Sequence, residues 1–112
     1  VTSDSRIKTD ISLISDDTAL NLVNALESYE YHYIDPERKQ PMKTIGFIAQ
    51  EIQEVEPRLV KEGDPDEHGN QYLSVAYPSL TAHLVEAIKE QNVIINNLNE
   101  RIQKLENQHG TE

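Results

Sequence analysis

The chain contains no cysteine and no tryptophan, and it has only one phenylalanine and four glycines among its 112 residues. The lack of cysteine excludes disulfide frameworks, thiolate nucleophiles and zinc sites built on cysteine. The glycines stand singly, so no glycine-rich loop is available to cradle a phosphate. No apolar run approaches the ~18–20 residues that span a bilayer, and the first ten residues lack the apolar core of a signal peptide. These absences predict no redox chemistry, no nucleotide cradle and no membrane partner.

Basic residues are also scarce, at 10 Lys and Arg against 20 Asp and Glu, which gives a net charge of −10 and a pI near 4.7. A phosphate backbone would repel such a chain, so bulk charge excludes a nucleic-acid partner. Hydrophobic residues make up 37% of the chain, which is low for a globular protein. They nevertheless recur in periodic order, so we predict a folded chain of one small domain at most.

The hydrophobic pattern predicts an α+β body over residues 1–77, with a small antiparallel sheet and short helices. Residues 1–14 are expected to form an extended or irregular arm, followed by a helix from about Asp17 to Ser28 that Ser15 or Asp16 caps. Tyr29, Tyr31 and Tyr33 alternate with other residues, which predicts a strand with three tyrosines on one face. The remaining expected elements are a turn at 35–41, a strand at 43–47, a helix at 49–55 ended by Pro57, and a hairpin from 59 to 75.

A single long helix is predicted for residues 78–112, because nothing after Pro78 breaks helical periodicity until Gly110. Seven residues in this helix repeat at alternating intervals of four and three, which is the heptad spacing of a coiled coil. They are Leu84, Ile88, Gln91, Ile95, Leu98, Ile102 and Leu105, called the seam below. From Pro78 to Leu105 the helix would measure about 42 Å, whereas the body would be about 30 Å across. The seam therefore needs partner helices.

The number of partner helices stays open on seam chemistry alone. Isoleucine at the a positions with leucine at d favours a coiled coil of two helices. Val93 and Ile94 widen the apolar face and Gln91 places a polar group in the seam, which favours more than two. Arg101 and Glu106 occupy g and e positions, where an interhelical ion pair of a parallel coiled coil would form.

Other candidate sites have simple structural interpretations. The four histidines, at positions 32, 68, 83 and 109, show no ligand spacing, so we expect hydrogen-bonded or solvated imidazoles and no metal. The segment from Asp64 to Gly69 resembles half of a calcium loop, but Val75 stands where the bidentate glutamate should be. The tyrosine stripe is expected to serve packing. No cofactor is predicted.

The first eight residues, VTSDSRIK, contain a serine and a lysine that could act as nucleophile and base. A neutral amine can take the hydroxyl proton while the serine attacks a carbonyl. Ser3 and Lys8 are five residues apart, which places them on opposite faces of a strand and about 140° apart on a helix. Either the chain turns between them or the lysine comes from a neighbouring subunit. To act as a base, Lys8 would need desolvation or a like-charged neighbour such as Arg6, whereas acidic Asp4 and Asp10 would oppose loss of the lysine proton.

Three blocks in order carry a resemblance that covers nearly the whole chain: SDSRIKTDI from Ser3, GFIAQEIQEVEPRLV from Gly46, and YLSVAYPSLTAHLVEAIKE from Tyr72. Together they resemble the intramolecular chaperone auto-processing domain. This self-cleaving peptidase domain stands at the C-terminus of bacteriophage tail spikes and fibres such as endosialidases and neck appendages.

The resemblance implies a homotrimer whose long helices form a trimeric coiled coil and whose client is the upstream stalk of the same polypeptide. It implies release by cleavage at the N-terminal boundary, around Thr2, Ser3 and Asp4, with Ser3 as nucleophile and Lys8 as its partner. The precursor would be a virion component made in the cytoplasm of a bacterial host. The alternative is a non-catalytic trimerisation or attachment module in which SDSRIK is only a structural turn.

Overall fold

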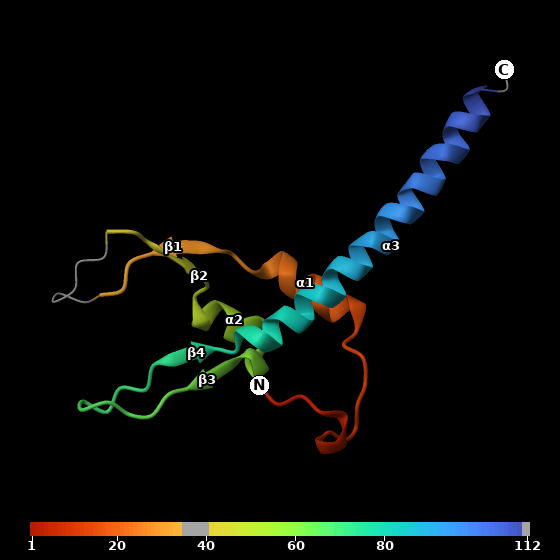
Figure 1. Cartoon of the computed structure of the whole chain (residues 1–112). Coiled ribbons are helices and arrows are strands. Elements are labelled where there is room, and N and C mark those ends of the chain that lie inside the picture. The colour runs from red at the N-terminus through yellow and green to blue at the C-terminus, as the bar shows by residue number, and fades with distance from the viewer. Residues whose placement is uncertain (35–40, 111–112) are drawn as a thin grey trace.

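The computed structural model describes residues 1–34 and 41–110 and shows two β-hairpins and two short helices gathered around the start of one long helix (Figure 1). The predicted turn at 35–41 falls almost entirely outside the described residues. The elements in order are η1 (Ser5–Ile7), α1 (Asp16–Ala25), β1 (Tyr29–Tyr31), β2 (Thr44–Gly46), α2 (Ala49–Val55), η2 (Pro57–Leu59), β3 (Val60–Glu62), β4 (Leu73–Val75) and α3 (Tyr77–Gly110).

A small core lies where α1, α2 and η2 meet the first turns of α3. Leu22, Ile52, Leu59 and Leu80 come from these four elements and are each at most 2% exposed. Because apolar residues recur at helical spacing, each helix offers a single stripe to this shared centre. The body is therefore held by contacts between residues far apart in sequence, and it positions the hairpins and the base of α3.

The α+β class predicted from the sequence is confirmed, with the antiparallel pairing divided between two two-stranded sheets. In the first, β1 pairs with β2 so that Tyr29 faces Gly46; in the second, β3 pairs with β4 so that Val60 faces Val75. Each sheet joins strands that are neighbours in the sequence, and α2 with η2 separates the two hairpins along the chain. The hairpin predicted from 59 to 75 is thus confirmed.

Helix α1 begins as predicted, since the Ser15 side chain accepts a hydrogen bond from the Thr18 N–H at 3.1 Å. It ends three residues before the predicted end at Ser28. Leu26 already has extended backbone angles (φ −85°, ψ 141°), which turn the chain into β1. The apolar stripe of α1 packs along α3 through buried Ala19 and Leu22.

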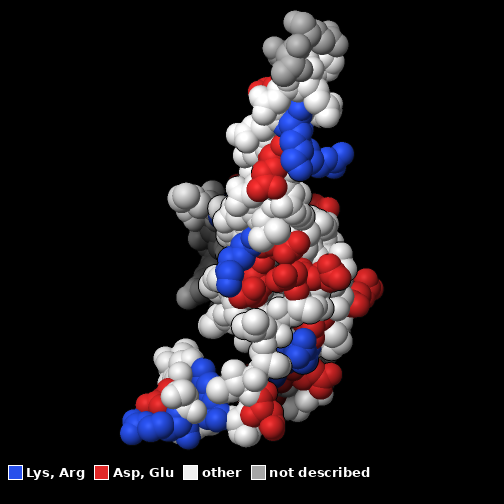
Figure 2. Space-filling model, turned by 90° about the vertical axis from the view of Figure 1, so that its right-hand side faces the viewer, with Lys and Arg blue, Asp and Glu red and all other residues white. Residues whose placement is uncertain are grey.

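Acidic side chains gather over the middle of the molecule, at the level where α1 meets α3 (Figure 2). Asp16 and Asp17 open α1 and lie near Glu90 of α3. Partial burial raises the pKa of Glu90, and a hydrogen bond with Asp16 and the charges of both aspartates raise it further. The negative charges of the same aspartates stabilise α1, because the N-terminal end of the helix dipole is positive.

Helix α3 extends far beyond the body, and its seam is about half exposed within one chain. All six apolar side chains of the seam are between 38% and 58% exposed. The chain has a radius of gyration of 20.9 Å and extents of 76 × 43 × 23 Å, whereas a compact chain of this length would have a radius near ~13 Å. Across residues 1–34 and 41–110 no helix is both long and apolar enough to cross a membrane.

Candidate functional site

In the N-terminal arm, the predicted serine and lysine lie on either side of a single 3-10 turn, η1. Asp4 caps this turn with its side chain, which accepts a hydrogen bond from the Arg6 N–H at 2.9 Å. The Ile7 and Lys8 amides donate to the carbonyls of Asp4 and Ser5, each at 3.2 Å. Aspartate is favoured at such caps because its short carboxylate reaches orphan amides. The backbone therefore reverses locally between Ser3 and Lys8.

This turn brings the two predicted residues together within one chain. Lys8 Nζ donates a hydrogen bond to Ser3 Oγ at 2.5 Å. Of the two routes left open by the spacing, the chain takes the first, a turn between the residues. Both side chains are exposed, as are all residues from Val1 to Leu13, so the Thr2–Ser3 peptide bond lies at the surface.

A second pair of side chains shares the turn. Both carboxylate oxygens of Asp4 accept hydrogen bonds from the Arg6 guanidinium, with four nitrogen-to-oxygen distances between 2.8 and 3.2 Å when the Arg6 amide is included. The side-chain bond to Arg6 is the main reason that the pKa of Asp4 is lowered. The sequence had pointed to Asp4 only as a cleavage-site neighbour and as an acid unfavourable to Lys8. An aspartate two residues before an arginine was the signal available for this contact.

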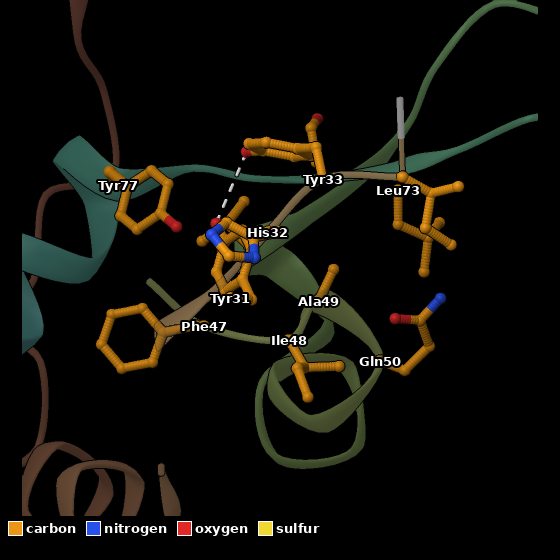
Figure 3. Close-up of a pocket in the computed structure, with 12 residues that line it drawn as sticks. Tyr31, His32, Tyr33, Phe47, Ile48, Ala49, Gln50, Leu73 and Tyr77 are labelled. Carbon is orange, nitrogen blue, oxygen red and sulfur yellow. Dashed lines mark hydrogen bonds between the residues drawn. The ribbon is translucent and has the colours of Figure 1, made fainter. Parts of the chain in front are cut away.

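A cavity of about 740 Å³ lies between the two hairpins, at the start of α2 (Figure 3). Tyr31 and Tyr33 line it, with their rings edge to face at 5.3 Å and their hydroxyls 3.4 Å apart. This hydrogen bond is the main cause that raises the pKa of Tyr31 to about 12. Tyr29, in contrast, points to α2 and donates to the Glu51 carboxylate at 2.8 Å. The tyrosine segment thus joins the first hairpin to α2.

Gly46 explains how the tyrosines converge beside this cavity. A Cβ atom at Gly46 would lie 2.9 Å from the Tyr31 hydroxyl and 3.0 Å from the Tyr77 hydroxyl, which is closer than side chains tolerate. A side chain at this position would displace the tyrosine hydroxyls, and glycine lets them approach β2 closely. The first hairpin therefore lies in close contact with Tyr77, the first residue of α3.

Hydrogen bonds to the backbone account for His83 and for the loop that resembles a calcium site. His83 is 6% exposed and its Nδ1 lies 2.9 Å from the Ser79 carbonyl. In the second hairpin, the Asp66 carboxylate accepts hydrogen bonds from the amides of His68 and Asn70 at 2.9 Å, which closes the turn around Gly69. Within the part of the chain that the structure describes, no group of three or more His, Asp or Glu side chains is arranged so that it could hold a metal ion.

A family model described as "chaperone of endosialidase" matches residues 3–61, which is more than half of the chain. The chain belongs to this family. The match includes η1 and its Ser3–Lys8 contact, the first hairpin, α2 and the start of the second hairpin. The resemblance stated from the sequence is thereby confirmed.

A viral protein is similar to part of this chain. Over 63 residues, covering 56% of the chain, the sequence is 40% identical to the uncharacterized protein VP1 of Micromonas pusilla reovirus (isolate Netherlands/2005). The aligned stretch is only 3% of that protein, so the chain spans a small fraction of the length of this curated relative.

Proposed function

We propose that this chaperone domain assembles three copies of a fibrous viral protein and then releases itself by a single self-cleavage at Ser3. The observation that carries the proposal is the 2.5 Å contact between Lys8 Nζ and Ser3 Oγ on an exposed turn. The contact unites a candidate nucleophile with a candidate base, next to a peptide bond that solvent can reach. Membership of the chaperone family supports the assembly role.

The proposed cleavage proceeds in two balanced steps. Lys8, once its ammonium has lost a proton, takes the Ser3 hydroxyl proton while Ser3 Oγ attacks the carbonyl carbon of Thr2. The Thr2–Ser3 C–N bond breaks, the Ser3 nitrogen receives the proton, and Thr2 remains esterified to Ser3 Oγ. Water then hydrolyses the ester, which leaves a carboxylate on Thr2 and a free hydroxyl and amine on Ser3.

The proposed trimer rests on the exposed seam of α3. Helix α3 extends beyond the body, and the apolar seam side chains from Leu84 to Leu105 are 38–58% exposed in a single chain. Three parallel copies would cover the seam and hold three upstream segments in register. A local coiled coil raises the effective concentration of those segments, which suppresses misassembly of slow, non-local stalk pairings. Removal of the domain afterwards would trap the folded product kinetically.

The client is the stalk that precedes the domain in the same polypeptide. The viral relative is consistent with this arrangement, because the matching stretch is a small part of a much longer chain. We place the precursor in the cytoplasm of the infected host and the product in the virion, as in the tail spikes and fibres of bacteriophages that the sequence resembles. Neither a nucleic acid nor a membrane is needed as a partner.

Self-cleavage is tested by fusing a reporter domain in front of Val1 and following intact mass over time. The wild-type fusion is expected to separate at Thr2–Ser3, whereas Ser3→Ala and Lys8→Ala remain whole. Lys8→Arg also remains whole, because it keeps the charge but cannot act as a base near neutral pH. Ser5→Ala is the matched control. The backbone carbonyl of residue 5 still accepts the hydrogen bond from the Lys8 amide, so we expect cleavage to continue. Processing of Ser3→Ala at the wild-type rate would leave only a plain trimerisation module.

A further inference from the structure

The carboxylate nearest to the reacting pair in sequence is fully engaged by an arginine. Asp4 follows Ser3 directly, and its two oxygens accept hydrogen bonds from Arg6 Nε and Nη2 at 2.8 to 3.2 Å. Across residues 1–34 and 41–110, Lys8 makes one side-chain hydrogen bond, to Ser3, and takes part in no ion pair. Two cations and one carboxylate thus share a six-residue turn, and the arginine holds the carboxylate.

This division matters for a lysine that must lose a proton. A carboxylate that pairs with an ammonium group favours its charged form, and a protonated amine cannot accept the serine proton. A guanidinium is always charged and presents a rigid fork that fits both carboxylate oxygens at once, so it competes well against a lysine for the same anion. We propose that Arg6 is a positioning residue: it occupies the Asp4 carboxylate and so leaves the Lys8 amine to Ser3.

Asp4 cannot simply be absent from the turn, because the same carboxylate caps η1 through the Arg6 amide. The cap brings Lys8 back to Ser3 but also places a negative charge beside the pair. Arg6 removes the conflict between these two effects. The inference rests on the proposed self-cleavage, for which it specifies how the base is kept available.

The fold itself has little need of Arg6. The Arg6 side chain is 87% exposed, and exposed ion pairs contribute little to the stability of a folded chain. The chain also offers a matched pair remote in sequence: Arg58 binds the Glu56 carboxylate at the start of η2 through its amide, Nε and Nη2, at 2.8 to 3.2 Å. Arg58 therefore controls for loss of an equivalent contact away from Ser3.

The test compares the pH dependence of cleavage in the reporter fusion. In Arg6→Ala the freed Asp4 carboxylate pairs with Lys8, so we expect the half-maximal rate about one pH unit higher and cleavage about tenfold slower at pH 7. Asp4→Asn combined with Arg6→Ala removes the competing charge and keeps a capping side chain, so the wild-type pH profile returns. Arg58→Ala is expected to leave the profile unchanged.

A purely structural role for Arg6 gives a different result. Arg6→Ala and the double variant would then be equally slow, with no displacement of the pH profile, and the proposal would be overturned. Wild-type behaviour of Arg6→Ala would overturn it as well.

A second readout separates this proposal from the proposed function. The NMR shift of the Lys8 Cε group is followed against pH in the 112-residue chain without a reporter. We expect a higher titration midpoint in Arg6→Ala and its return in the double variant. If the midpoints move in this way while no fusion is cut, self-cleavage is refuted and the competition for Asp4 stands. If the midpoints do not move, the competition is refuted whether or not the fusions are cut.

Discussion

Two charges placed in the seam of α3 should dissociate the assembly. The six apolar seam side chains are 38–58% exposed in one chain. Complete burial of a Leu or Ile side chain contributes ~1.5–3 kcal/mol, so covering the exposed half of six such groups contributes about 5–9 kcal/mol per chain. Ile95→Asp with Leu98→Asp removes a third of that contribution. It also buries two carboxylates without partners, at a cost of several kcal/mol for each.

Light scattering at micromolar concentration measures the effect directly. The wild-type chain should give three times 12.8 kDa, and the double variant 12.8 kDa. Asn96→Asp with Asn97→Asp adds the same charge at b and c positions of the heptad, off the seam, and should remain trimeric. A wild-type chain that is monomeric under these conditions would refute the seam argument, and a stable dimer would refute the proposed stoichiometry.

Two further predictions concern the body. Leu22→Ala should lower the free energy of unfolding by about 2–5 kcal/mol in urea titrations because Leu22 is 1% exposed, whereas Leu13→Ala, at 88% exposed, should change it by less than ~0.5 kcal/mol; equal effects would contradict the described core. The hydrogen bond from Arg58 lowers the pKa of Glu56 from 4.5 to about 2. The ionised Glu56 carboxylate therefore stabilises the folded chain above pH 4.5, and this stabilisation is lost as pH falls towards 2. The melting temperature should therefore fall over this range, and less steeply in Glu56→Gln; identical slopes would show that Glu56 does not contribute.

The sequence predicts the elements best where a local signal fixes both ends. Helix α2 has the predicted bounds, Ala49–Val55, because Pro57 follows closely and prevents its continuation. The Ser15 cap was likewise visible as a serine before two aspartates. The alternating tyrosines predicted a strand from 29 to 34, but β1 ends at Tyr31, opposite Thr44, the first residue of its three-residue partner β2. Strand length depends on the partner, which periodicity in one segment does not report.

The sequence indicated Ser3 and Lys8 as a candidate pair, but not the contact between them. Nothing in the spacing of Ser3 and Lys8 says that they meet, because the contact depends on a turn that Asp4 and Arg6 stabilise. The cavity beside Tyr31 could not be predicted from the sequence either, because both hairpins and α2 contribute its lining residues. His83 was predictable in principle, because it lies three residues after Leu80 and four before Ala87 on the buried face of α3.

The local character of the Ser3–Lys8 contact has a consequence for timing. Every hydrogen bond that shapes this turn joins residues at most five positions apart. Loops of about ten residues close in ~10–100 ns, whereas subunit assembly takes milliseconds to minutes. The Ser3–Lys8 contact would thus be in place long before three chains could meet. If cleavage is to follow folding of the stalk, the rate-limiting step must be chemical, either proton loss from Lys8 or attack by Ser3. Formation of the Ser3–Lys8 contact is too fast to set the delay.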